Sequence, residues 1–288
     1  MSDLILSPRE FRLLEGVRLN PRKSFLGRVR GERVTKRTGI SIEFADYRDY
    51  TEGDDLRHLD WNVLARLDTP IVKTYQDEED LAVHLLVDLS PSMNFGDPTK
   101  LDSAKKLAAS LGYIALAAGD AVYLRQLGQK AVPIRSRAGY PKLARSINQM
   151  VLKQNYQVTE VLRSFAKEQN RPGVVVLLSD GWDAEICSAL RLVAGRGHEV
   201  HFLQVLTASE LNPDMEGDLR LVDAEGGAPR EITANRDTLV AYKQNVANHN
   251  AEIAATCLAI GARYHQVKQD DSLESVVKDV WKRQGWVV

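Results

Sequence analysis

Residues 81–92 read LAVHLLVDLSPS, and residues 173–181 read GVVVLLSDG. Each stretch is a near-continuous apolar run that ends in an aspartate, Asp88 in the first and Asp180 in the second. Strands covered by helices on both faces have this pattern, whereas half-exposed strands alternate apolar and polar residues. The two stretches therefore predict buried strands of a parallel sheet, each with a carboxylate at its carboxyl end.

Helical and strand-like segments alternate along the rest of the chain. Apolar residues recur at helical spacing over 100–118, 159–167, 185–194, 236–260 and 273–284, and further strands are predicted over 121–128, 130–135, 198–206 and 262–268. A β-hairpin insertion is predicted over 218–233, around two adjacent glycines. This order of elements predicts the α/β class, with a mostly parallel sheet flanked by helices.

The region before residue 79 has a different pattern. It contains a basic arm with few acidic residues, whose members are Arg18, Arg22, Lys23, Arg28, Arg30, Arg33, Lys36 and Arg37. The arm is either a solvated surface or a docking site for an acidic protein or a phosphate backbone. Residues 40–78 mix apolar, aromatic and charged residues, and strands are predicted around Ile40 and Ile42 and over 71–75. We therefore expect an accessory segment over 1–78 and the α/β domain over 79–288.

The composition restricts the class of protein. Hydrophobic residues make up 44% and charged residues 27% of the 288, as in globular proteins, and a net charge of -1 gives no overall attraction to nucleic acid or membranes. Cys187 and Cys257 fall in predicted helices, where we expect buried thiols in a reducing compartment. The chain has neither a signal-peptide pattern nor a long apolar run, so we expect a cytoplasmic protein without a membrane span.

Oxygen-bearing side chains follow both apolar strands, at the edge where ligands bind in open α/β sheets. Asp88, Ser90 and Ser92 have the spacing D-x-S-x-S, which lets alternate side chains of an extended turn point the same way. Asp180 adds a second carboxylate, and Thr159 opens the helix that precedes its strand. These hard oxygen ligands suit Mg²⁺, with Mn²⁺ and Ca²⁺ as alternatives. The structural alternative is that the serines cap the next helix and Asp180 forms a turn.

This order of residues resembles the metal-ion-dependent adhesion site of von Willebrand factor A domains, which combines D-x-S-x-S, a threonine and a strand-ending aspartate. The resemblance implies a von Willebrand factor A-like, Rossmann-like fold in which Asp88, Ser90, Ser92, Thr159 and Asp180 hold the metal. Family members often have Gly-Gly-Thr where this chain has Gln-Val-Thr. An acidic residue of a partner would complete the coordination, so the resemblance implies a protein-binding site.

The block before the first apolar strand resembles the signature of the domain-of-unknown-function family number 58. That signature runs F-x-x-x-R-x-Y-x-x-G-D-D-x-R-x-x-D-W and ends in A-R. The matching residues are Phe44, Arg48, Tyr50, Gly53, Asp54, Asp55, Arg57, Asp60, Trp61, Ala65 and Arg66. From the residues alone, the arginines either pair with the acids and fasten the segment, or exposed members of the block recognise a partner.

The resemblance covers about residues 25–288 and implies a setting for the protein. Members commonly begin with two transmembrane helices, whereas we expect this chain to represent a soluble branch. Members are often encoded beside MoxR-type AAA+ ATPases. The implied partner is such an ATPase, or a client protein that supplies an acidic residue, in the assembly or maturation of protein complexes.

The sequence favours a binding module over an enzyme. None of the six histidines shares a short motif with the predicted ligands, and the sequence has no glycine-rich phosphate loop. One alternative is a metal-dependent phosphatase or hydrolase acting through Asp88, although phosphatases of the haloacid-dehalogenase type need an acid where this chain has Ser90. A second alternative is nucleic-acid binding through the basic arm, which the scarcity of aromatic residues there disfavours.

Overall fold

The computed structural model describes residues 5–23, 43–51, 54, 56–76, 80–126, 128, 131–214, 217–222, 224 and 226–288. Contacts within the chain divide it into two units, one of residues 1–23 with 81–288 and one of residues 24–80. This division differs from the predicted boundary because the N-terminal residues pack with the C-terminus. Arg18 and Val288 exchange two backbone hydrogen bonds of 2.9 Å, beside a bridge between Leu19 and Val287.

The larger unit is built on a five-stranded sheet in which every neighbouring pair of strands is parallel, in the order β4-β3-β5-β6-β9. The strands are β3 (Ala82–Val87), β4 (Ala121–Arg125), β5 (Val174–Ser179), β6 (Glu199–Leu206) and β9 (Arg263–Lys268). Every residue of β3, β5 and β6 is buried, as their unbroken apolar runs predict. The predicted α/β class with a parallel sheet is confirmed.

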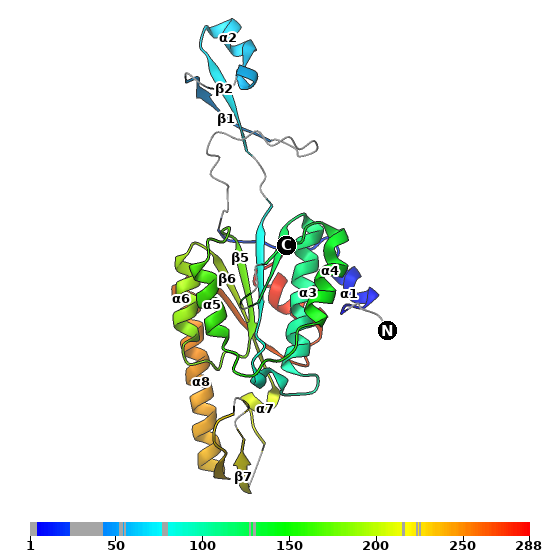
Figure 1. Cartoon of the computed structure of the whole chain (residues 1–288), viewed down its shortest axis with the longest axis vertical. Coiled ribbons are helices and arrows are strands. Elements are labelled where there is room, and N and C mark those ends of the chain that lie inside the picture. The colour runs from blue at the N-terminus through cyan, green and yellow to red at the C-terminus, as the bar shows by residue number, and fades with distance from the viewer. Residues whose placement is uncertain are drawn as a thin grey trace. The chain divides into compact units, whose positions relative to one another are not determined.

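Helices cover both faces of this sheet (Figure 1). One face carries α5 (Val158–Lys167), α6 (Ile186–Gly195) and α8 (Arg236–Ala259), and the other carries α1 (Pro8–Leu14), α3 (Lys100–Ala118) and α4 (Tyr140–Asn148). The predicted C-terminal helix is found as α9 (Leu273–Ser275) continued by the π-helical η4 (Val276–Lys282). Short helical turns form η2 (Pro91–Asn94), η3 (Arg137–Gly139) and α7 (Ala208–Leu211). The helices that carry the two cysteines bury both of them as free thiols.

A hairpin follows α7, as predicted. Its antiparallel strands are β7 (Gly217–Leu221) and β8 (Arg230–Ala234), and it leads into the long helix α8. The buried residues of α8 all lie from Val246 onward. The part of α8 before Val246 extends together with the hairpin beyond the end of the sheet (Figure 1).

The second unit contains an antiparallel strand pair and a short helix. Strand β1 (Glu43–Asp49) pairs with β2 (Ile71–Gln76), and η1 (Leu56–His58) and α2 (Trp61–Leu67) lie between them in the sequence. Asp60 caps α2 by accepting hydrogen bonds from two backbone amides of its first turn, at 3.0 and 3.3 Å. Several predicted features fall outside the described residues: Ile40, Ile42, Gly53, Asp55, Arg28, Arg30, Arg33, Lys36 and Arg37.

Candidate metal centre

The candidate site lies where the chain order of the sheet reverses, between β3 and β5. Asp88 follows β3 directly, and Ser179 and Asp180 stand at the end of β5. The amide of Asp88 donates a 2.8 Å hydrogen bond to the carbonyl of Leu178, which joins the two strand ends. Open α/β sheets bind ligands beyond the carboxyl ends of their strands at such a reversal. The two predicted carboxylates therefore come from the strand ends where a ligand is expected.

Asp88 is held in place by hydrogen bonds from both sides. Its side chain accepts from the amide of Ser90 at 2.9 Å and from the hydroxyl of Ser179 at 2.5 Å, and the residue is 1% exposed. The Ser179 hydroxyl in turn accepts from the amide of Gly181 at 2.9 Å. Gly181 has a φ of 75°, which glycine adopts without a steric penalty. The turn after β5 thus presents Ser179 to Asp88.

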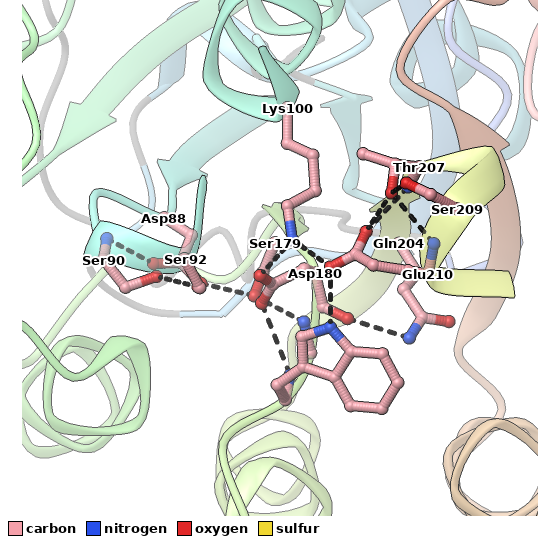
Figure 2. A network of polar contacts seen from close by, with 12 residues as sticks. Asp88, Ser90, Ser92, Lys100, Ser179, Asp180, Gln204, Thr207, Ser209 and Glu210 are labelled. Carbon is pink, nitrogen blue, oxygen red and sulfur yellow. Dashed lines mark hydrogen bonds and ion pairs between the residues drawn. The ribbon is translucent and has the colours of Figure 1, made fainter. Parts of the chain in front are cut away.

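The two serines direct their hydroxyls at each other. The Oγ atoms of Ser90 and Ser92 lie 3.0 Å apart. Ser90 immediately precedes η2, yet its side chain makes no capping hydrogen bond to that turn. The alternative in which Ser90 caps the next helix is therefore wrong, and its hydroxyl faces Ser92 beside Asp88 (Figure 2).

A buried lysine reaches Asp180 from the first position of α3. The Lys100 ammonium lies 2.8 Å from Oδ2 of Asp180 and 2.5 Å from Oε1 of Glu210, and the residue is 1% exposed. Figure 2 shows this ammonium between the two carboxylates, with Asp88 and the serines on the far side of Asp180. Asp180 therefore belongs both to the predicted metal ligands and to a buried ion cluster that the sequence did not indicate.

Thr159 is tied to the loop that follows β5. It is 2% exposed, and its hydroxyl donates a 2.6 Å hydrogen bond to the carboxylate of Asp183. That carboxylate also accepts from the amide of Glu185 at 3.0 Å. The observed contact of Thr159 is thus to an acid three residues beyond Asp180, and its role as a metal ligand stays a prediction.

The groups around Asp88 do not fully compensate its negative charge. Burial, and after it the negative charge of Asp180, raise the pKa of Asp88 to about 6, and the hydrogen bonds from Ser179 and Ser90 only partly oppose them. Asp88, Asp180 and Glu210 together carry three negative charges when ionised, against one positive charge on Lys100. These four groups therefore hold a formal charge of -2, which a divalent cation would balance.

The loop after β5 is fastened by an aromatic pair. The indole of Trp182 stacks on the imidazole of His249, with centroids 5.1 Å apart and an interplanar angle of 18°. His249 also lies 2.8 Å from the carbonyl of Gly181, and the Trp182 indole N–H donates to Glu210 at 3.2 Å. These contacts give His249 a positioning role for the loop.

The donor set fits a hard divalent cation. Asp88, Ser90, Ser92 and Asp180 offer carboxylate and hydroxyl oxygens, the ligands that Mg²⁺ prefers. In the described part of the chain, no three His, Cys, Asp and Glu side chains gather as a metal-binding group. A metal at this edge would therefore depend on the serine hydroxyls as well as on the two aspartates.

The site residues that were not predicted include Lys100, Ser179, Asp183 and Glu210. Ser179 was open to prediction, because it is the one polar residue in an apolar strand and directly precedes Asp180. Glu210 stands three residues after Thr207, the spacing of a capping box, which the structure contains. That spacing predicts a helix start but gives no indication that the second carboxylate oxygen reaches a lysine 110 residues away.

The signature residues of the second unit form a local cluster of their own. Arg48 makes a bidentate pair with Asp54, through contacts of 2.8 and 2.6 Å. Hydrogen bonds from Arg48 and, after them, from the amide of Thr51 hold the pKa of Asp54 well below its usual value. Trp61 is 59% exposed, so it is not a core residue of the described part of this unit.

The remaining signature residues have separate places. Asp60 is buried and caps α2, Arg57 is an exposed residue of η1, and Arg66 lies in the last turn of α2. Arg48 and Asp54 form one pair of the kind that the structural interpretation of the block predicts.

Comparison with protein families identifies a match over most of the chain. The family described as "Protein of unknown function DUF58" matches residues 46–252, which is more than half of the sequence. This span includes every predicted metal ligand and the signature residues from Arg48 onward. None of the described helices is long and apolar enough to cross a membrane.

Similar proteins come from mycobacteria and Bacteroides. A protein of Mycobacterium tuberculosis, described as uncharacterized, is 27% identical over 291 residues, which cover 96% of this chain and 90% of that protein. An uncharacterized protein of Mycobacterium avium is 31% identical over 124 residues, covering 41% of this chain and 70% of that protein. Among solved structures, the conserved hypothetical protein BatB from Bacteroides thetaiotaomicron has a TM-score of 0.45 at 17% identity, covering 71% of this chain and 98% of that chain.

Proposed function

The chain belongs to the DUF58 family, and we propose that it acts as a divalent-metal-dependent protein-binding module built on a von Willebrand factor A-like domain. The observation that carries the proposal is the meeting of Asp88 and Asp180 at the point where the strand order reverses, with the Ser90 and Ser92 hydroxyls beside Asp88. The ammonium of Lys100 offsets only one of the three negative charges of Asp88, Asp180 and Glu210, and a divalent cation would balance the other two. Perturbed acids of this kind are typical of functional sites.

Mg²⁺ is the metal that the proposed ligands suit best, with Mn²⁺ and Ca²⁺ as alternatives. Asp88 and Asp180 supply the charge, and Ser90 and Ser92 supply neutral oxygens. When bound, the ion would provide a hard Lewis-acidic centre that accepts one further oxygen ligand from outside the chain. Asp88 is already oriented for this role by the amide of Ser90 and the hydroxyl of Ser179, so little rearrangement is needed.

The proposed partner is a protein that presents an aspartate or glutamate to the metal. Resemblance to the DUF58 family suggests a MoxR-type AAA+ ATPase, or a client protein of that ATPase, during the assembly or maturation of a protein complex. The cytoplasm is the proposed place of action, since such an ATPase consumes ATP. Thr159 is retained in the proposed ligand set through its position beside the loop after β5, where Asp183 orients it.

The two alternative functions have less support. A phosphatase or hydrolase would need a general acid near Asp88, where Ser90 stands, and the imidazole of His249 is engaged by Trp182 and the carbonyl of Gly181. Nucleic-acid binding would use the basic arm, of which the structure describes Arg18, Arg22 and Lys23, and the ammonium of Lys23 is engaged as a donor to the carbonyl of His198 at 2.8 Å. Protein binding at the metal therefore remains the proposed function.

A capture experiment tests the proposal. The protein is immobilised and exposed to the purified MoxR-type ATPase of the same organism, in Mg²⁺ and in EDTA. We expect capture by the wild type in Mg²⁺, and loss of capture in EDTA and with Asp88→Ala. Asp279→Ala, which removes an exposed carboxylate of η4, is the matched control and should retain capture. Equal capture by the wild type in both buffers and by Asp88→Ala would contradict the proposal.

A further inference from the structure

The buried lysine of the candidate site has no place in the proposed ligand set. Lys100 is the first residue of α3, where the helix dipole opposes a positive charge, and lysine is among the residues most rarely buried. Its ammonium is nevertheless enclosed, at 1% exposure, between Asp180 and Glu210. Such an arrangement persists only where the paired charges compensate the loss of hydration.

Glu210 fixes the position of this ammonium. One of its carboxylate oxygens accepts from the amide and the hydroxyl of Thr207, at 2.7 and 3.0 Å, in the capping box of α7. The other accepts from Lys100 at 2.5 Å and from the indole N–H of Trp182 at 3.2 Å. Because both oxygens of Glu210 are engaged, Lys100 is held against Asp180 by a rigid support.

The position of Lys100 changes the charge that a metal would meet. Asp180 shares its negative charge with the ammonium, whereas the described contacts of Asp88 are hydrogen bonds from an amide and a hydroxyl. A divalent cation at this site would therefore meet the whole negative charge of Asp88 but only part of that of Asp180.

We infer that Lys100 is a resident cation that partly neutralises Asp180 and so makes the metal centre depend on an acidic ligand from the partner. The inference rests on the proposed function, because it concerns the same site. Lys100 acts here as a positioning and specificity-determining residue. It weakens the binding of the metal alone and strengthens the binding of a carboxylate to the loaded site.

The inference predicts opposite changes in two affinities, which a purely structural lysine would not produce. Mg²⁺ is titrated calorimetrically into the wild type and into Lys100→Met, whose unbranched side chain is one atom shorter and carries no charge. We expect Lys100→Met to bind Mg²⁺ at least about tenfold more tightly, because a positive charge close to the metal is removed. When sodium acetate replaces sodium chloride at equal ionic strength, we expect a larger gain in Mg²⁺ affinity in the wild type than in Lys100→Met.

Two further variants keep the experiment decisive. Lys105 lies on the same helix, and its ammonium donates to the carbonyl of Asn148 at 3.4 Å. Lys105→Met is the matched control and should behave like the wild type. Glu210→Gln leaves Lys100 paired with Asp180 and removes the second carboxylate, so it should bind Mg²⁺ more weakly and gain more from acetate. Glu210→Gln decides the question if Lys100→Met does not fold.

The outcomes separate the inference from the proposed function. Absence of Mg²⁺ binding in the wild type and in every variant overturns the proposed function, and the inference with it. Binding in the wild type with equal or weaker affinity in Lys100→Met overturns the role of Lys100 and leaves the proposed function standing. An unchanged Mg²⁺ affinity in Glu210→Gln overturns that role as well.

Discussion

A carboxylate is buried at each end of the central sheet, and its pKa is shifted in opposite directions at the two ends. At the amino end, Glu199 accepts hydrogen bonds from the amides of Arg22 and Lys23 at 2.7 and 2.8 Å, and its other oxygen lies 2.7 Å from Nε2 of His201. Burial alone would raise the pKa of Glu199, but these hydrogen bonds outweigh it and hold the pKa below its usual value. At the carboxyl end, burial and Asp180 raise the pKa of Asp88 to about 6.

The difference distinguishes a structural acid from a functional one. Glu199 fastens the N-terminal segment to β6, has a hydrogen-bond partner on each carboxylate oxygen, and lies 3.5 Å from the cationic guanidinium of Arg263. Asp88 is equally buried, yet it faces a second carboxylate and lacks a cationic partner among its described contacts. Folding satisfies the first acid completely, whereas the second remains to be satisfied by a ligand.

The largest expected effect is on the amino end. Glu199→Ala leaves two backbone amides and the ring of His201 without their partner and removes a counter-charge of the buried Arg263. We therefore expect the free energy of unfolding to fall by about 3–5 kcal/mol. Guanidinium unfolding followed by circular dichroism at neutral pH measures this loss. A loss below about 1 kcal/mol, the value of an ordinary exposed pair, would show that the fastening is not structural.

In EDTA, a substitution of Asp88 at the carboxyl end of the sheet is expected to stabilise the fold. The pKa of Asp88 lies above its ordinary value of 3.8 in the folded state, so ionisation penalises folding progressively from about pH 4 to pH 6 and fully above that. Asp88→Asn removes the penalty while keeping an acceptor for the amide of Ser90. We expect the free energy of unfolding at pH 7.5 to rise by about 1–3 kcal/mol. A fall of similar size would contradict the contrast between the two acids.

Acidification tests the amino end through its buried histidines. Burial lowers the pKa of His198 to about 4 and that of His84 to about 3, whereas the unfolded chain takes up protons near pH 6.5. Stability is therefore lost as the pH falls below about 6.5. His198→Gln should reduce the loss between pH 7 and pH 5 by about 1–2 kcal/mol, measured by unfolding at both values. An identical loss in the variant would show that His198 does not titrate on unfolding.

The smallest effect is expected at an exposed ion pair of the same unit. Glu274 lies 3.1 Å from Arg9 and 2.7 Å from Lys278, and its side chain is 43% exposed. Glu274→Gln should leave the free energy of unfolding within experimental error, because exposed pairs are screened and flexible. Glu274→Gln serves as the control for Glu199→Ala. A clear destabilisation by Glu274→Gln would show that the effect of removing a carboxylate does not depend on its burial.

The sequence predicted those parts of the fold and site that depend on local pattern. Unbroken apolar runs identified β3 and β5, and the aspartates that end them identified the edge of the sheet where the candidate site lies. Helix α4 was not predicted, although its buried residues have helical spacing, because Pro141 and the preceding turn interrupt the surrounding pattern.

The rest depends on contacts between residues far apart in the sequence. Lys100 begins a helix after an ordinary capping residue, and a lysine there is normally exposed. Its ammonium is paired with Asp180 after β5 and with Glu210 in α7, 80 and 110 residues away, and no local pattern encodes these contacts. The same holds for the basic arm, where Arg22 and Lys23 have backbone amides that bind Glu199, 177 and 176 residues away.

Calorimetric titration of Mg²⁺ into the wild type and Asp88→Ala tests the central claim most directly. We predict that the wild type binds Mg²⁺ with a stoichiometry of about one per chain, as expected for a single oxygen-ligand site, and that Asp88→Ala shows no binding. Absence of binding in the wild type, or the same affinity in Asp88→Ala, would contradict the assignment of the under-compensated end of the sheet as a metal centre.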